Sequence, residues 1–227
     1  MHKLRALLVD IDGTLIDSNA AHARTWRQVL ARHGHALPED RIRPLIGKGG
    51  DKMLAELMPG ASPDLAAELM HERSRRFLSQ ELHALKPTRG ARELLLALRS
   101  RHLGIVVATS AQASETARLL AQAGLDDLVD AAADSSDADQ TKPDPDIVQA
   151  ALQRAGVLAS ESLMLGDTPW DIAAAGRAGV RTIVLRCGGW WNDDAFEGAA
   201  EIRDDPADLA ANLEGSQIGM RLAADHR

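Results

Sequence analysis

Short, nearly continuous apolar runs recur along this chain, separated by longer segments in which apolar residues have helical spacing. A run of roughly four to eight apolar residues without polar alternation is typical of a strand buried on both faces, as in a parallel sheet. We therefore predict strands at residues 4–11, 103–108, 162–165 and 182–185, and a weaker one at 128–131.

Helical segments with recognisable ends lie between these runs. Asp144 and Pro145 are typical of an N-cap and a first helical residue, whereas Gly124 and Gly156 are typical of residues that end a helix. Because strands and helices alternate, we predict an α/β fold with a Rossmann-like parallel sheet core flanked by helices. The tail, residues 215–227, has no clear strand and is expected to be partly frayed. The helices are predicted at residues 90–99, 114–123, 145–155 and 171–178.

One long stretch, residues 16–86, has no strand candidate. An all-helical block of this size, placed between the first strand and its next helix, predicts an inserted all-helical cap domain over residues 16–86. The α/β core is then discontinuous in sequence and consists of residues 1–15 and 87–227. The helical segments of the insertion are expected at residues 20–31, 38–46, 51–58 and 63–82.

Composition and charge narrow the class of protein. The 227 residues are 45% hydrophobic and 26% charged, which is ordinary for a globular chain. The net charge of −7 disfavours nucleic acid or an anionic membrane as a partner, and no apolar run approaches the roughly 18 residues of a membrane span. The single cysteine, Cys187, is expected to be a small, buried residue. A single cysteine cannot form an internal disulfide, and no segment looks like a signal peptide, so we predict a cytoplasmic location. The oligomeric state is left open.

Polar side chains follow the predicted strands at the edge where ligands of open α/β sheets bind. Asp10 and Asp12 follow the first run, Thr109 follows the run 103–108, and Asp167 follows the run 162–165. Lys142 lies on a loop that can reach the same edge. Carboxylates that converge repel one another unless a cation neutralises them, and oxygen ligands favour a hard ion such as Mg²⁺.

This combination of groups suits phosphoryl transfer. With a metal in place, one carboxylate can attack phosphorus to give an aspartyl-phosphate, while a lysine and a hydroxyl hold the non-bridging oxygens. A second carboxyl two residues along the chain can protonate the leaving alkoxide and later deprotonate water.

In order and position, these groups resemble the four motifs of the haloacid dehalogenase-like hydrolase superfamily. They are the stretch Asp10–Leu15, Thr109, Lys142–Pro143, and Gly166–Asp167 with Asp171. The resemblance covers nearly the whole chain. The helical insertion directly after the first motif is similar to the subgroup that contains phosphoglycolate phosphatases and β-phosphoglucomutases.

The resemblance implies a role for each motif residue. Asp10 is implied as nucleophile and metal ligand, and Asp12 as general acid/base whose backbone carbonyl also binds the metal. Asp167 is implied as the third protein ligand of Mg²⁺, with Asp171 supporting the water shell of the ion. Thr109, Ser110 and Lys142 are implied as groups that bind the phosphoryl oxygens.

Plainer interpretations of the same residues stay open. Thr109 could simply end its strand, with Ser110 as the true ligand. Asp171 could be the N-cap of its helix. Asp10 and Asp12 could form a polar turn, and Lys142 could be a solvated loop residue.

The residues of the predicted cap are less specific. His22 shares a helix face with Trp26 and could touch substrate or simply pack. Lys48 precedes a helix and could meet a substrate anion, or it could lie in a solvated turn. Three tryptophans could line the site entrance or serve in packing: Trp170, Trp190 and Trp191.

The first motif also separates activities within the superfamily. Dehalogenases have an aromatic residue where this chain has Asp12, whereas an acid there serves phosphate esters. β-Phosphoglucomutases carry an arginine in the cap turn, at the position where this chain has Gly49–Gly50. They also carry Lys and Asn shortly after the second motif, at the position where this chain has residues 111–113. We therefore expect a Mg²⁺-dependent phosphatase acting on a small phosphorylated metabolite. The alternatives are a β-phosphoglucomutase-like phosphomutase and a non-catalytic member that binds a phosphorylated ligand.

Overall fold

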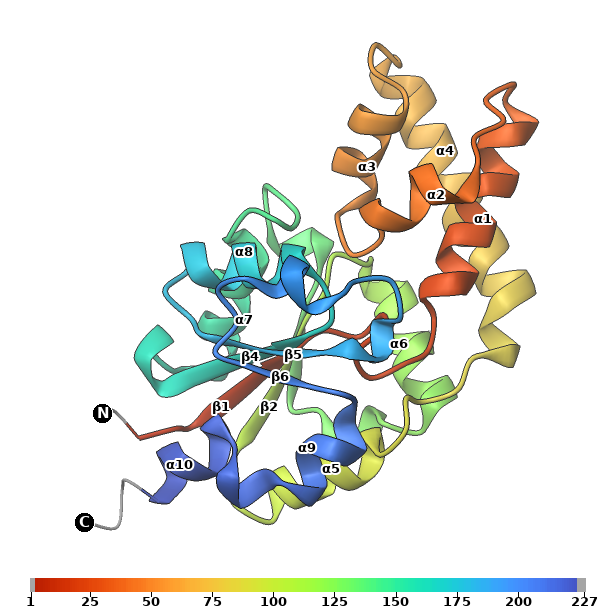
Figure 1. Cartoon of the computed structure of the whole chain (residues 1–227). Helices are drawn as coiled ribbons and strands as arrows, with labels where there is room; N and C mark the ends of the chain where they lie inside the picture. Colours follow the sequence, from red (N-terminus) through yellow and green to blue (C-terminus); the bar gives the residue numbers. More distant parts are fainter. Residues whose placement is uncertain (1–2, 224–227) are drawn as a thin grey trace.

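The computed structural model describes residues 3–223 and contains a six-stranded sheet in which every pair of neighbouring strands is parallel (Figure 1). The strand order is β3-β2-β1-β4-β5-β6, so β1 lies in the interior between β2 and β4. Val9 is in register with both Val107 and Leu165. The predicted α/β fold is confirmed. The strands are β1 (Ala6–Val9), β2 (Gly104–Ala108), β3 (Ala131–Ala133), β4 (Ser162–Gly166), β5 (Thr182–Leu185) and β6 (Glu201–Arg203).

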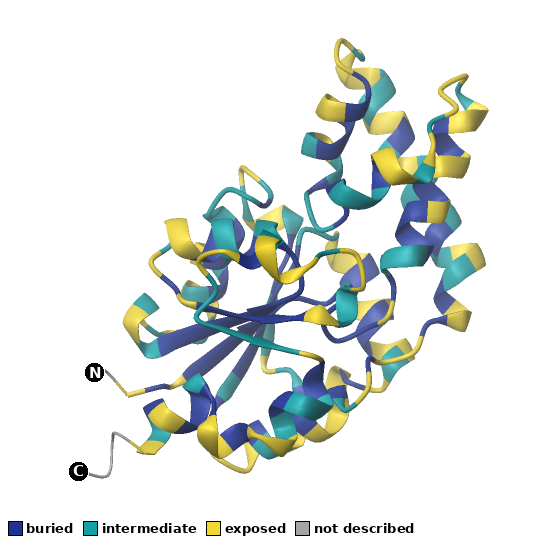
Figure 2. Ribbon diagram, in the orientation of Figure 1, coloured by how far each residue is buried: buried dark blue, intermediate teal, exposed yellow. Residues whose placement is uncertain are grey.

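Helices cover both faces of the sheet, which explains why the inner strands are continuous apolar runs. Successive strand residues point to opposite faces. Leu8 packs in one cluster with α7 and α8, while Leu7 and Val9 pack in another with α5, α6, α9 and α10. The central strands are accordingly buried in Figure 2. No helix among residues 3–223 is long and apolar enough to cross a membrane. The core helices are α5 (Ala91–Arg99), α6 (Ala113–Ala123), α7 (Asp146–Ala155), α8 (Pro169–Arg177), α9 (Pro206–Ala211) and α10 (Gln217–Ala223).

Four helices follow β1 and group together to one side of the sheet (Figure 1). They enclose their own apolar cluster, which includes Trp26, Leu30, Met53 and Leu69. We call α1–α4 the helical insertion. Its division from the sheet at residues 16 and 86 stays a prediction. The helices are α1 (Asn19–Arg32), α2 (Glu39–Ile42), α3 (Gly50–Leu57) and α4 (Pro63–Arg76).

Several predicted boundaries were wrong. The helix expected over 63–82 ends at Arg76 and continues as a π-helical turn and a short 3₁₀ segment. The strand expected at 128–131 begins only at Ala131. The N-cap of α7 is Pro145 rather than Asp144. The Asp144 carboxylate instead forms ion pairs with Lys52 and Arg177, which draw it away from the helix end.

The last part of the described chain is more ordered than expected. β6 was missed because it is a short, partly exposed edge strand with charged residues at both ends, a composition that keeps edges from aggregating. The expectation of a frayed tail was wrong for residues 215–223. Ile218 of α10 is buried in the core, and Arg221 donates a hydrogen bond to the Ser162 carbonyl oxygen at 2.7 Å. Residues 224–227 lie outside the described chain.

Candidate active site

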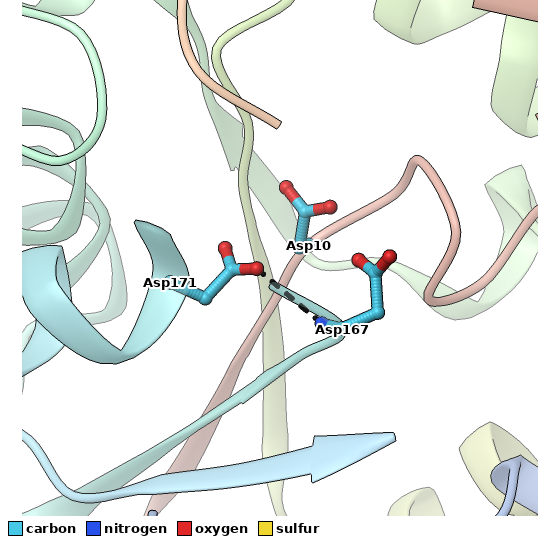
Figure 3. A group of neighbouring side chains, drawn as sticks. All are labelled: Asp10, Asp167 and Asp171. Carbon is cyan, nitrogen blue, oxygen red and sulfur yellow. Dashed lines mark hydrogen bonds between the residues drawn. The ribbon is translucent and has the colours of Figure 1, made fainter. Parts of the chain in front are cut away.

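Three buried carboxylates converge at the carboxyl ends of β1 and β4 (Figure 3). Asp10 follows β1, Asp167 follows β4, and Asp171 lies in the first turn of α8. One oxygen of each lies within 4.8 Å of the others. Because β1 and β4 are adjacent and parallel, their carboxyl ends meet at one edge of the sheet. The expected convergence of Asp10 and Asp167 is therefore present.

The Lys142 ammonium lies inside this group. Its Nζ is 2.5 Å from Oδ1 of Asp10 and 2.7 Å from Oδ1 of Asp171, and its side chain is 1% exposed. Burial disfavours the charged lysine, but the two carboxylates outweigh burial and raise the pKa of Lys142 above its ordinary value. Lys142 is thus a fixed positive charge beside Asp10, and not a solvated loop residue.

One ammonium among three carboxylates leaves negative charge uncompensated. Burial raises the pKa of Asp10, and repulsion from Asp171 and Asp12 raises it further. These effects outweigh the attraction of Lys142, which lowers it, so that the pKa of Asp10 is about 7. Burial and the charges of Asp171 and Asp10 also raise the pKa of Asp167 well above its ordinary value. A buried set of hard oxygen donors with excess negative charge fits a divalent cation.

The carboxylate of Asp167 is held from several sides. Thr14 donates to its Oδ1 at 3.0 Å, and Asn19 donates to its Oδ2 at 2.8 Å. Two glycines let the backbone approach: a Cβ on Gly13 would lie 2.2 Å from Oδ2, and one on Gly188 would lie 1.9 Å from it. Gly13 also has a φ of 79°, which favours glycine. These contacts fix the orientation of the Asp167 carboxylate.

Asp171 connects the site to the start of α8. Its Oδ2 accepts hydrogen bonds from the Thr168 hydroxyl at 2.6 Å and the Thr168 N–H at 3.1 Å, while its Oδ1 faces Lys142. The alternative that Asp171 is an N-cap was wrong, because Thr168 caps α8 and Asp171 completes the capping box.

The Asp12 side chain contacts α1 and the residue before it. Its Oδ1 accepts hydrogen bonds from Ser18 Oγ at 2.5 Å and from His22 Nε2 at 2.7 Å. Burial opposes ionisation of Asp12, but the interactions with His22 and Ser18 outweigh it and lower the pKa to about 2. Asp12 is therefore held as a carboxylate in this arrangement.

A chain of contacts runs from Asp12 across the helical insertion to α6. His22 stacks on Phe77 with ring centroids 4.1 Å apart, and its Nδ1 accepts a hydrogen bond from Arg73. A guanidinium only donates, so Nε2 of His22 carries the hydrogen that is donated to Asp12. Arg73 Nη1 also lies 2.8 and 2.9 Å from the two carboxylate oxygens of Glu115, which is buried in the first turn of α6.

Arg73 and Glu115 were not singled out in the sequence. Charged residues on predicted helices are usually solvent-exposed, so neither residue carried a signal by itself. Their partnership joins α4 to α6 over 42 positions, which only the folded structure reveals.

A cavity of about 310 Å³ opens beside Asp10 and Asp12. Thr109 and Ser110, which follow β2, line it. The Thr109 hydroxyl accepts a hydrogen bond from the Ala111 N–H at 3.1 Å, so its own hydrogen can be donated to a bound oxygen. Lys142, Asp167 and Asp171 lie buried behind the wall rather than lining the cavity. The residues that line the cavity also include His22, Trp26, Lys48, Asp51, Arg73, Glu115 and Asp139.

Lys48 reaches the cavity but is not a free cation. Its ammonium is paired with Glu56 and lies 4.0 Å from the ring centroid of Trp170. Trp190 and Trp191 line a separate cavity of about 200 Å³ and are not among the residues that line the cavity beside Asp10. Cys187 also lines that cavity and is only partly buried, and burial raises the pKa of its thiol.

The family is decided by a direct match. The sequence model of the haloacid dehalogenase-like hydrolases matches residues 4–179. The chain belongs to this family. The hydrolase is 31% identical over 224 residues to a phosphoglycolate phosphatase of Rhodospirillum rubrum, covering 95% of this chain and 93% of the relative.

Other relatives of the hydrolase carry different substrate names. A validoxylamine A 7'-phosphate phosphatase of Streptomyces hygroscopicus is 27% identical over 181 residues, which cover 80% of this chain and 85% of the relative. The crystal structure of a hydrolase from Pseudomonas syringae superimposes with a TM-score of 0.87 at 29% identity, covering 93% of this chain and 98% of that one. The similarity thus extends over the sheet and the helical insertion alike.

Proposed function

We propose that this haloacid dehalogenase-like hydrolase is a Mg²⁺-dependent phosphatase of a small phosphorylated metabolite, with Asp10 as nucleophile. The observation that carries the proposal is the Asp10 carboxylate at the cavity wall, 2.5 Å from the buried Lys142 ammonium and beside Asp167. The names of the relatives from Rhodospirillum rubrum and Streptomyces hygroscopicus support hydrolysis of a phosphate ester.

The first step forms a bond between an Asp10 oxygen and phosphorus and breaks the bond between phosphorus and the ester oxygen. Lys142 offsets charge on Asp10 and on the transferring group, while Thr109 and Ser110 donate to the non-bridging oxygens. The departing alkoxide takes a proton from Asp12, so Asp12 must carry that proton in the substrate complex, although its contacts with Ser18 and His22 favour the carboxylate in the free protein.

The second step hydrolyses the aspartyl-phosphate. Asp12, now a carboxylate, takes a proton from water as the water oxygen attacks phosphorus and the bond to Asp10 breaks. The hydrogen bonds from Ser18 and His22 favour this carboxylate form. The helical insertion acts as a cap that shields the intermediate from bulk solvent.

Asp10, Asp167 and the backbone carbonyl of Asp12 would hold the metal, and Asp171 would support its water ligands. When bound, Mg²⁺ supplies neutralisation of charge on the phosphoryl oxygens. The contacts of Asp167 with Thr14 and Asn19 orient its carboxylate for this role.

Hydrolysis is favoured over the phosphomutase alternative, because a mutase must also grip a second phosphate. Gly49, Gly50 and residues 111–113 offer no charged side chain for this purpose. Binding of a phosphorylated ligand without turnover is the other alternative. A cytoplasmic location, and the lack of nucleic-acid and membrane partners, stay predictions.

Turnover of p-nitrophenyl phosphate tests the proposal. We expect activity with Mg²⁺ that EDTA removes and that Asp10→Asn abolishes while the fold survives. Asp127→Asn is the matched control, because Asp127 is a surface residue paired with Arg92. Wild-type rates in a folded Asp10→Asn variant, or no turnover by the wild type, would overturn the proposal.

A further inference from the structure

We infer that the substrate is a phosphomonoester whose alcohol part carries no second anionic group. The inference rests on the proposed phosphatase function and deepens it. It comes from the charged side chains of the cavity and from the partners that they already have.

The first cation of the cavity, Arg73, already has partners within the protein. Its Nη1 contacts both oxygens of Glu115, and Nη2 donates to His22. Glu115 is 1% exposed and also accepts a hydrogen bond from Ser74 at 3.0 Å. A substrate carboxylate would have to displace this tethered carboxylate and leave it buried without its cation, which is unfavourable.

The second cavity cation, Lys48, has partners as well. Its ammonium pairs with Glu56 of α3 and lies over the Trp170 ring, and its side chain is only 8% exposed. Lys142 is committed to Asp10, Asp171 and the phosphoryl group. A second anion on the substrate therefore finds no uncommitted cation among these three.

The other charges of the wall are negative. Asp51 and Asp139 are exposed at the cavity, and Asp51 accepts a hydrogen bond from Thr141 at 2.8 Å. Apart from Asp10 and Asp12, the charged residues of the wall are thus two cations, Lys48 and Arg73, and three carboxylates, Asp51, Glu115 and Asp139. Carboxylates facing an anionic group repel it and so select against it.

The helical insertion gives the same cavity an apolar side. Trp26, Ile46, Met53 and Met70 all line it. Such a wall gains free energy by burying carbon atoms and offers no partner for a charged group. An alcohol part with an apolar side fits this cavity when it is neutral, or when it carries a cationic group that faces Asp51 and Asp139, whereas a carboxylate or a second phosphate does not fit.

Three short phosphate esters test the inference on the wild-type protein with Mg²⁺. They are 2-phosphoglycolate with a carboxylate, 2-hydroxyethyl phosphate with a neutral group, and O-phosphoethanolamine with an ammonium. We expect kcat/KM for the neutral and cationic esters to exceed that for 2-phosphoglycolate by about tenfold or more. An equal or higher value for 2-phosphoglycolate would overturn the inference. Failure of the phosphatase proposal would instead appear as no turnover of p-nitrophenyl phosphate.

A variant that frees Arg73 from its ion pair tests whether this pairing causes the discrimination against anionic substrates. Glu115→Gln removes the competing charge, so we expect kcat/KM for 2-phosphoglycolate to rise about tenfold relative to 2-hydroxyethyl phosphate. Glu214→Gln is the matched control, because Glu214 forms an exposed pair with Arg101 outside this cavity, and the ratio should not change. If Glu115→Gln does not fold, Glu56→Gln takes its place in the test, because it frees Lys48 from its ion pair. An unchanged ratio in the folded variant would overturn the assignment.

Discussion

Asn19, the first residue of α1, donates its side-chain N–H to Oδ2 of Asp167 at 2.8 Å and to the Gly188 carbonyl oxygen at 3.2 Å. One side chain thus joins the helical insertion to the carboxylate that follows β4. The orientation of Asp167 and the position of the start of α1 are therefore coupled.

Asn19→Ala should weaken metal binding. Loss of the hydrogen bond frees the Asp167 carboxylate to rotate, and a lost partner of a metal ligand typically costs about 10- to 100-fold in metal affinity or activity. A Mg²⁺ titration of p-nitrophenyl phosphate turnover measures the shift. Asn212→Ala is the control, because Asn212 makes comparable hydrogen bonds to Asp208 on the surface. An unchanged Mg²⁺ dependence of Asn19→Ala would contradict the coupling.

Lys142→Met should reduce both stability and activity. Without its ammonium, Asp10 and Asp171 remain buried without a cation. Breaking such a pair costs about 3–5 kcal/mol of unfolding free energy in the metal-free protein. Loss of the charge beside Asp10 should lower kcat by about 10²- to 10³-fold.

Urea unfolding in EDTA and turnover in Mg²⁺ measure these two effects. Lys52→Met is the matched control. Lys52 is partly exposed and pairs with Asp144, so its loss should cost about 1 kcal/mol or less. Similar losses in the two variants would show that the buried position of Lys142 is not what matters.

The metal-free protein should lose stability as the pH rises from 5 to 8. The pKa of Asp10 is about 7 in the folded chain against 3.8 for a free aspartate, so the folded state holds a proton that the unfolded state has released. The unfolding free energy therefore falls across this window. Asp12, with a pKa of about 2, changes stability only at lower pH.

Thermal melting in EDTA at several pH values checks this prediction. Asp10→Asn should make the pH profile less steep, and the raised pKa of Asp167 accounts for the slope that remains. Mg²⁺ should stabilise the wild type more at pH 8 than at pH 5, since protons compete with the metal for the carboxylates. A metal-free wild type whose stability does not fall from pH 5 to pH 8, or falls no more steeply than that of Asp10→Asn, would contradict the assignment.

Gly13→Ala and Gly60→Ala form a matched pair of substitutions. Both glycines have positive φ, 79° and 94°, so both variants carry the same kind of backbone strain of about 1–3 kcal/mol. Only at Gly13 would the new Cβ meet the carboxylate of Asp167, at 2.2 Å, whereas nothing lies within 4 Å at Gly60. We expect Mg²⁺-dependent turnover to be lost in Gly13→Ala and kept in Gly60→Ala. Equal turnover in the two would show that the close approach at Gly13 is dispensable.

The parts of the fold that the sequence predicted are those with strong local patterns. β1, β2, β4 and β5 are largely buried on both faces, so each appears as an apolar run. β6 is only partly buried, has charged residues at both ends and shows no such pattern. The start of α7 was misplaced because the Asp144 carboxylate bonds to Lys52 and Arg177, which are far away in sequence.

The same division holds for the site. Asp10, Asp167 and Lys142 stand in recognisable motifs, and parallel strands bring such positions to one sheet edge. The pairing of Arg73 with Glu115 depends on how α4 lies against α6, and no local pattern records that arrangement. The partner of Lys48 could not be inferred either, since Glu56 is one of several acidic residues within reach in the sequence.

The interior position of β1 has a consequence for how the protein is made. Ala6 pairs with Gly104 on one side and with Ser162 on the other, and Asp10 meets Lys142 across 132 positions. β1, which Asp10 follows, leaves the ribosome before both of its neighbours, β2 and β4, which are translated much later. Until then its two edges lack their native partners, and such distant pairing slows folding. A nascent chain released before β4 would therefore contain the complete first motif and still have no assembled site.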